Sequence, residues 1–268
     1  MEANLRARLL TALVGVPLLI LLVARSSTAV FSTVIFFVTV LALGEYFRMV
    51  FPNGLRDQLL GVGFGAALSL SLLYGGAETV QLSTALVLLL YFSLYIWLSG
   101  SLEDKLRRLA WLMLGGFYLG YLLPHLALLF RLPEGRHWVL FVLIVIMSGD
   151  SVAYFAGKRF GKKRLAPEIS PGKTVEGALG YFAGSVIAGL IGAKYLFVGI
   201  SAHTICALAL VLATLGQVGD LFESWIKRVF SVKDSGQLLP GHGGLLDRLD
   251  SLIFPAVFTT AYLRVFYP

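Results

Sequence analysis

The segment KDSGQLLPGHGGLLDRLDS, residues 233–251, gathers charged side chains and glycines in a chain that is otherwise 57% hydrophobic and only 14% charged. The residues of interest in it are Lys233, Asp234, Gly241, His242, Gly243, Gly244, Asp247, Arg248 and Asp250. Carboxylates can hold a hard divalent cation such as Mg²⁺, which keeps some waters and takes further ligands from phosphates. Glycines let backbone N–H groups approach an anion closely. The segment therefore predicts phosphate chemistry.

Two further carboxylates interrupt apolar stretches of the chain. Asp150 lies in VLIVIMSGDSVAYFAG, and Asp220 lies in LVLATLGQVGDLFESWIKR. A carboxylate inside a membrane-spanning helix is costly, which makes each of them a candidate functional residue. Each lies seven residues before the start of a basic stretch, and a rise of 1.5 Å per residue places both about 10 Å below one membrane surface. With Asp247 and Asp250, at the start of the last apolar stretch, they predict four acids at one depth.

Structural roles for these acids are alternatives that stay open at this point. Asp150 can pair with a neighbouring basic residue such as Lys158, and Asp220 can pair with Lys227. The two acids at the start of the last apolar stretch can complement a helix dipole, because acids are favoured in a first turn. Four such roles at one depth would be a coincidence, so we favour one shared site.

The tripeptide Gly172-Lys173-Thr174, within ISPGKTVEG, is similar to the end of a phosphate-binding P-loop. That pattern requires a glycine at position 167, where this chain has Pro167, so a P-loop is excluded. Lys173 can still bind a phosphate as a point charge. Thr174 and Glu176 are expected to begin the following helix.

The elements that must position these residues are predicted to be membrane-spanning helices. The mean hydropathy of the chain is +0.83, and about 20 consecutive apolar residues suffice to cross a bilayer. The apolar stretches are 9–24, 28–44, 58–76, 80–99, 109–130, 138–156, 177–199, 203–222 and 252–267. We therefore predict an all-α, polytopic integral membrane protein with about nine transmembrane helices. Arg6 and Arg8 before the first stretch are also typical of a signal peptide, but the long apolar run favours a retained helix.

The distribution of basic residues predicts the orientation. With the N-terminus in the cytoplasm, the opposite side holds only five of the 22 Lys and Arg residues, and the cytoplasmic side holds the rest. This bias fits the positive-inside rule. It also accounts for the net charge of +7, so no nucleic-acid partner is expected. The polar site in the C-terminal half is therefore predicted to face the cytoplasm from the cell membrane.

Two regions differ in their connections. Residues 1–136 have short connections and few ionisable groups within their apolar stretches, which predicts a lipid-facing scaffold. Residues 137–268 contain two long connections, 157–176 and 223–251. Connections of this length are usually functional or disordered, and their glycines and interspersed apolar residues argue against disorder. We therefore predict that residues 137–268 form the catalytic region.

The polar residues of this region follow a specific pattern. The pattern is Ser224-x-x-Lys227-Arg228, Lys233-Asp234-x-Gly236, His242-Gly243-Gly244 and Asp247-Arg248-x-Asp250. It closely resembles the signature of phosphatidate cytidylyltransferases, integral membrane enzymes that make CDP-diacylglycerol from CTP and phosphatidic acid. SPGKTVEG and GDSVAYFAGKRFGK also look like this family, so the resemblance spans about residues 147–251. The first half is similar only in being a run of apolar stretches.

The resemblance implies a reaction in which the phosphate of phosphatidic acid attacks the α-phosphorus of CTP and pyrophosphate leaves. Mg²⁺ is the expected cofactor, with a second metal or a monovalent cation left open. Asp220, Asp247 and Asp250 are the leading expected metal ligands, and Asp150 is a weaker candidate. The residues expected to act in catalysis are Lys173, Lys227, Arg228, Lys233, Asp234, His242 and Arg248. Those expected to bind substrate are Ser170, Thr174, Ser224, Gly241, Gly243 and Gly244.

Two other functions stay open as alternatives. A CTP-dependent polyprenol or phytol kinase would transfer the γ-phosphoryl group to an alcohol, but the long signature argues against it. An ion-coupled transporter would place its acids near the bilayer midplane in repeat-related sets, whereas these gather towards one face. The expected partners are CTP, phosphatidic acid and the lipid bilayer. The glycine pairs Gly116–Gly120 and Gly180–Gly184 favour close helix packing inside the chain and leave a homodimer open.

Overall fold

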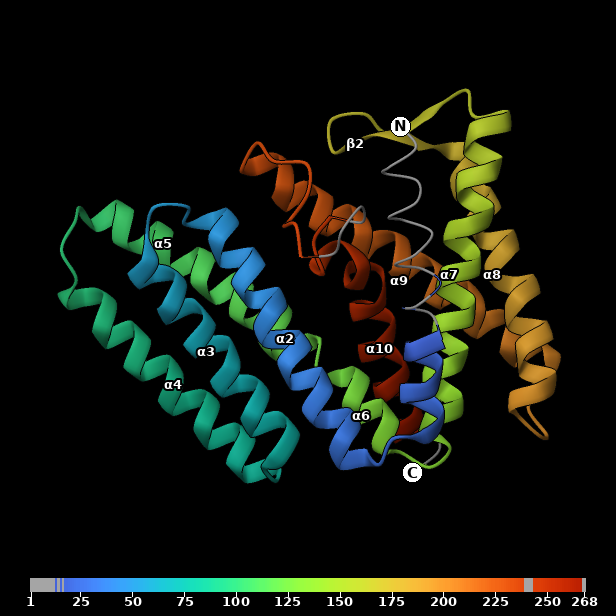
Figure 1. Cartoon of the computed structure of the whole chain (residues 1–268), viewed down its shortest axis with the longest axis horizontal. Helices are drawn as coiled ribbons and strands as arrows, with labels where there is room; N and C mark the ends of the chain where they lie inside the picture. Colours follow the sequence, from blue (N-terminus) through green and yellow to red (C-terminus); the bar gives the residue numbers. More distant parts are fainter. Residues whose placement is uncertain (1–12, 14, 16, 239–242, 267–268) are drawn as a thin grey trace. The chain divides into compact units, whose positions relative to one another are not determined.

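The computed structural model of the chain describes residues 13, 15, 17–238 and 243–266, which are almost entirely helical (Figure 1). Residues 17–25 are helical. The later helices are α2 (Thr28–Val50), α3 (Leu55–Tyr74), α4 (Ala77–Trp97), α5 (Leu102–Gly115), the π-helical η1 (Gly116–Leu122), α6 (His125–Arg131), α7 (Gly135–Phe160), α8 (Val175–Leu196), α9 (Ala202–Val229) and α10 (Leu246–Phe266). Two short strands, β1 (Arg164–Ala166) and β2 (Ser170–Thr174), lie between α7 and α8.

Eight helical segments of the described residues are long and apolar enough to cross a membrane, with α5, η1 and α6 together forming one of them. They overlap eight of the predicted apolar stretches, so the prediction of an all-α polytopic membrane protein is confirmed. The remaining stretch, 9–24, lies partly outside the described residues.

The chain divides into two compact units. Of the described residues, one unit comprises 13, 15, 26–128, 234–238 and 243–246, and the other comprises 17–25, 129–233 and 247–266.

In the first unit, α3 packs against α2, α4, α5 and η1. Small residues permit this packing: a Cβ added at Gly120 of η1 would lie 2.5 Å from the Cα of Gly65 in α3. The prediction that the Gly116–Gly120 pair packs inside the chain is therefore confirmed. The outer face of α4 exposes Leu82, Leu86 and Leu89, as expected of a helix that faces lipid.

In the second unit, α7 packs along α8, and α9 contacts both helices (Figure 1). A Cβ added at Gly184 of α8 would lie 2.7 Å from a methyl carbon of Val152 in α7, so the Gly180–Gly184 pair also packs within the chain. Gly219 of α9 likewise admits α10, because a Cβ there would collide with the carbonyl oxygen of Asp250. A Cβ at Gly216 would lie 2.7 Å from Ile146 Cδ1 of α7 and 2.7 Å from the hydroxyl oxygen of Tyr181 in α8.

The connection 157–176 is folded. Helix α7 continues to Phe160, and the rest forms an antiparallel β-hairpin in which Arg164 pairs with Thr174 and Ala166 pairs with Ser170. Sequence analysis did not predict these strands, because each is too short to show an alternating pattern.

Candidate functional site

Thr174 joins the hairpin to helix α8. Its hydroxyl oxygen accepts a hydrogen bond from the backbone N–H of Gly177 at 3.1 Å, which makes it the N-cap of the helix. Glu176, in the first turn, accepts a hydrogen bond from the backbone N–H of Lys162 at 3.0 Å. The prediction that Thr174 and Glu176 begin this helix is confirmed. These bonds hold Lys173, the preceding residue, at the junction of strand and helix.

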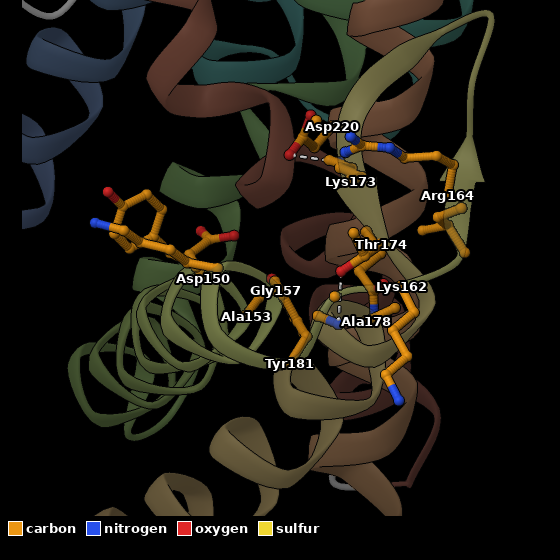
Figure 2. A pocket seen from close by; sticks show the side chains of 17 residues that line it. Asp150, Ala153, Gly157, Lys162, Arg164, Lys173, Thr174, Ala178, Tyr181 and Asp220 are labelled. Carbon is orange, nitrogen blue, oxygen red and sulfur yellow. Dashed lines mark hydrogen bonds and ion pairs between the residues drawn. The ribbon is translucent and has the colours of Figure 1, made fainter.

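A pocket of about 600 Å³ lies between the hairpin and helices α7, α8 and α9 (Figure 2). Asp150 and Asp220 line it, as do Thr174, Tyr181 and Gln217. Its basic lining residues are Lys158, Lys162, Arg164 and Lys173. A pocket that joins four basic side chains to two carboxylates can bind phosphate groups together with a cation.

Asp220 is held from two sides. Its Oδ2 forms an ion pair with Lys173 Nζ at 2.7 Å (Figure 2). Its Oδ1 accepts a hydrogen bond from the Ser224 hydroxyl at 3.3 Å. The alternative that Asp220 pairs with Lys227 is therefore wrong, because its basic partner comes from the hairpin. The carboxylate of Asp220 stays 31% exposed, so a ligand in the pocket can reach it.

Asp150, Asp220 and Asp250 lie close enough together to repel one another electrostatically. Lys173 and Arg248 are the basic groups close enough to attract Asp150, which replaces the suggested pairing with Lys158. Asp250 is buried in α10, where its Oδ1 accepts a hydrogen bond from the backbone N–H of Ser251 at 2.7 Å. Three acids from three helices thus concentrate negative charge in one part of the second unit.

Lys227 bridges two carboxylates in the same unit. Its Nζ forms an ion pair with Asp247 Oδ1 at 2.6 Å and a second ion pair with Glu223, one turn earlier in α9. The Glu223 side chain is 1% exposed and the Lys227 side chain 10% exposed. Lys227 therefore neutralises protein carboxylates in this structure.

Two glycines of the signature have geometry that only a small residue permits. Gly243 has φ +81°, a backbone conformation that other residues rarely adopt. Gly244 is buried, and a Cβ there would lie 2.8 Å from Glu45 Oε2 of helix α2. The predicted site residues Gly241 and His242 lie outside the described residues.

The sequence also resembles known proteins. The profile of the Cytidylyltransferase family matches residues 6–266, which is nearly the whole chain. The chain belongs to the cytidylyltransferase family. A phosphatidate cytidylyltransferase of Brucella abortus is 43% identical over 157 residues, which are 58% of each chain. One of Bacillus subtilis is 41% identical over 165 residues, which are 59% of this chain and 60% of that protein.

A third relative, the phosphatidate cytidylyltransferase of Staphylococcus saprophyticus, is 46% identical over 121 residues. That match covers 45% of this chain and 46% of the relative. The chain thus spans between about half and three fifths of the length of the curated relatives it matches.

The remaining predicted site residues lie in three settings. Arg228 donates hydrogen bonds to the carbonyl oxygens of Ile169 at 3.0 Å and Val232 at 3.2 Å, so it joins the turn of the hairpin to the end of α9. Ser170 begins β2. Lys233, Asp234 and Arg248 are exposed.

Three buried acids were not singled out from the sequence: Glu45, Asp57 and Glu223. Glu45, in α2, is 3% exposed. Glu45 lies one residue beyond the apolar stretch 28–44 and Glu223 one residue beyond the stretch 203–222, so the rule that selected Asp150 did not reach them. Glu223 also follows Asp220 by three residues and precedes Lys227 by four, which places all three on one face of a helix.

The carboxylates of the pocket fit Mg²⁺ by the chemistry of their donor atoms. Within the part of the chain that the structure describes, no three His, Cys, Asp or Glu side chains meet closely enough to form a complete metal site. Mg²⁺ usually needs only one or two protein carboxylates, because waters and substrate phosphates complete its octahedron. Asp150 and Asp220 offer such oxygens to the pocket.

Proposed function

We propose that this chain is a phosphatidate cytidylyltransferase, which condenses CTP with phosphatidic acid to give CDP-diacylglycerol and pyrophosphate. One observation carries the proposal. Four basic side chains line one pocket among membrane-spanning helices together with Asp150 and Asp220, as two phosphate-bearing substrates and a cation require. The names of the relatives support the choice of reaction.

The main obstacle to this reaction is repulsion between two polyanions. A phosphate oxygen of phosphatidic acid bonds to the α-phosphorus of CTP while the bond from that phosphorus to the bridging oxygen breaks, and pyrophosphate leaves with the electron pair. A phosphate monoester has a second pKa near 6, so the attacking oxygen is largely ionised at neutral pH. The reaction therefore needs positioning and neutralisation of charge more than a general base.

The basic residues of the hairpin supply part of that neutralisation. Lys173 is 27% exposed and pairs with Asp220, so it can exchange this partner for a phosphate oxygen. Lys162 and Arg164 line the same pocket. They add positive charge there and are not required to transfer a proton. Lys227, which bridges Glu223 and Asp247, serves mainly to position Asp247.

Asp150 and Asp220 would hold Mg²⁺ in this pocket, with the nearby Asp250 and Asp247 as further candidates. Bound Mg²⁺ would screen the negative charge of the triphosphate and of the pyrophosphate that leaves. A second metal or a monovalent cation belongs to the same proposal, since the acids of this region outnumber the lysines paired with them.

We further propose that the hairpin and the connection 230–245 face the cytoplasm of the cell from which the chain comes. The bias of Lys and Arg supports this orientation. CTP is soluble and arrives from the cytoplasm, whereas phosphatidic acid stays in its leaflet.

The Gly116–Gly120 and Gly180–Gly184 pairs pack inside the chain. A homodimer would therefore have to form through a different surface.

The experiment is to measure products from purified, detergent-solubilised protein given CTP and phosphatidic acid, with and without Mg²⁺. We expect equal amounts of pyrophosphate and CDP-diacylglycerol, only when all three are present. A parallel reaction with CTP and a polyprenol tests for a kinase, which would release CDP and no pyrophosphate. Release of CDP with the polyprenol, or no product in several lipid mixtures, would contradict the proposal.

A further inference from the structure

Glu45 is a buried acid of helix α2 in the first unit, far in sequence from the signature segment. It is 3% exposed. Leu43 and Phe47, two residues before and two residues after it in the helix, are fully buried. An ionised group inside a protein is costly unless it receives hydrogen bonds or an opposite charge. Its partners therefore show what it stabilises.

Those partners come from both ends of one segment. Glu45 Oε2 accepts a hydrogen bond from the backbone N–H of Leu246 at 2.9 Å. The hydroxyl of Ser235 lies 3.5 Å from the same oxygen. One carboxylate thus contacts two residues that are eleven positions apart in the sequence.

The bond to Leu246 has a second consequence, because Leu246 is the first residue of α10. The first N–H groups of a helix lack partners within the helix, and the dipole favours a negative charge there. Glu45 therefore stabilises the start of α10 as a capping residue would, although it belongs to a distant part of the chain.

Two glycines leave the space that this carboxylate fills. A Cβ added at Gly236 would lie 2.7 Å from Glu45 Cδ and 2.9 Å from its Cγ. A Cβ added at Gly244 would collide first with the hydroxyl of Ser235, and it would lie 2.7 Å from the backbone N of Gly236 and 2.8 Å from Glu45 Oε2. Neither glycine has a positive φ, so alanine is excluded by the lack of space and not by the backbone conformation.

We propose that Glu45 is a positioning residue for cytidylyl transfer, which acts by holding Ser235, Gly236, Gly244 and Leu246 around one buried carboxylate. This role rests on the proposed function. It explains why signature position 236 is a glycine, through its contact with an acid outside the signature. At position 244 Glu45 restricts the space together with Ser235 and Gly236. It also assigns the N-terminal helices more than the role of a lipid-facing scaffold.

The first test compares three single variants in the assay for CDP-diacylglycerol. Glu45→Ala removes every contact, and we expect a loss of kcat/KM on the order of 100-fold, the scale of a misplaced active-site element. Glu45→Gln keeps an oxygen for the Leu246 N–H but loses the charge, so we expect a smaller loss. Thr39→Val changes another buried polar residue of α2, whose hydroxyl bonds only the Ile35 carbonyl, and we expect unchanged turnover.

The second test is a double-mutant cycle with Gly236→Ala, which separates positioning from a general effect on folding. In the wild-type background the added methyl group collides with Glu45, and we expect lower turnover. In the Glu45→Ala background the space is free, so the same methyl group should cost several-fold less. A general loss of stability would instead make the two substitutions additive or worse. Thermal unfolding of all four proteins measures the coupling between the two substitutions in stability, independently of enzyme activity.

The outcomes are distinct. Wild-type protein that forms no CDP-diacylglycerol overturns the proposed function and this role with it. Active wild-type protein whose Glu45→Ala variant keeps its kcat/KM overturns this role alone, as does an additive cycle. A folded but impaired Glu45→Ala variant, in which Gly236→Ala costs little, is the result that we expect.

Discussion

Two acids of this chain, Asp57 and Asp220, show how a structural carboxylate differs from a carboxylate in a site. Asp57, in the first unit, is 3% exposed, and both of its oxygens are bonded: Oδ1 by the hydroxyl of Tyr95 at 3.1 Å and Oδ2 by Arg108 at 2.9 Å. Asp220, in the second unit, is 31% exposed and lines a pocket with its lysine partner.

The difference lies in access. Asp57 has exchanged water for fixed partners, so it contributes to the stability of the first unit. Asp220 has a partner that a ligand can replace, and two further acids, Asp150 and Asp250, repel it. A carboxylate in an apolar helix can therefore belong to a binding site when a ligand can still reach its oxygens. It has a structural role when its oxygens are buried against fixed partners.

The largest expected effect is on turnover. Asp220→Asn should lower the kcat for CDP-diacylglycerol formation by about 100- to 1,000-fold, the scale of losing one preorganised electrostatic group, with little change in thermal unfolding. Asp57→Asn should do the reverse and lower the unfolding midpoint while kcat per folded molecule stays the same. A fully active Asp220→Asn variant would contradict the claim that Asp220 belongs to the site.

A second pair of variants concerns the ion pairs. Lys227→Met removes the ion pairs with Glu223 and Asp247, and removing one partner of a buried ion pair costs about 3–5 kcal/mol of unfolding free energy. Arg107→Met removes an ion pair with Asp104 whose arginine side chain is 70% exposed, and surface pairs contribute at most about 1 kcal/mol. Unfolding in mixed micelles measures both. Equal losses for the two variants would show that burial does not distinguish these pairs.

The smallest expected effect concerns two tyrosine hydroxyls. Tyr95→Phe removes the hydroxyl that donates to Asp57 and should cost about 1 kcal/mol of unfolding free energy, as one hydrogen bond does. The hydroxyl of Tyr181 is buried and has no hydrogen-bond partner within the described residues, although Tyr181 lines the pocket. Tyr181→Phe should therefore cost no stability. If Tyr181→Phe lost as much unfolding free energy as Tyr95→Phe, the Tyr181 hydroxyl would have a structural role.

The sequence predicted the helices well, because runs of apolar residues report directly on the membrane. It also predicted that Asp150 and Asp220 belong to one site, because equal distances from two basic stretches set equal depths. It did not predict the partner of Asp220. Depth does not say which helices or loops touch, and the partner, Lys173, lies on a hairpin whose strands are too short to show a period.

Glu45 was missed for a related reason. Glu45 lies one residue beyond the apolar stretch 28–44, and its partner is the backbone N–H of Leu246. Backbone groups leave no trace in a sequence. The sequence favoured Gly241, Gly243 and Gly244 as close contacts for phosphate, and Gly236 is a further glycine of the signature. In the structure, a Cβ at Gly236 would meet Glu45, and one at Gly244 would meet Ser235, Gly236 and Glu45.

The most direct test of the account is the binding of Mn²⁺, a substitute for Mg²⁺ at carboxylate sites, measured by electron paramagnetic resonance in the presence of CTP. We expect wild-type protein and the Asp57→Asn variant to bind Mn²⁺ with the same affinity, and the Asp220→Asn variant to lose that binding while it stays folded. Equal binding by all three proteins would contradict the claim that the acids of the second unit, and not those of the first, form the cation site.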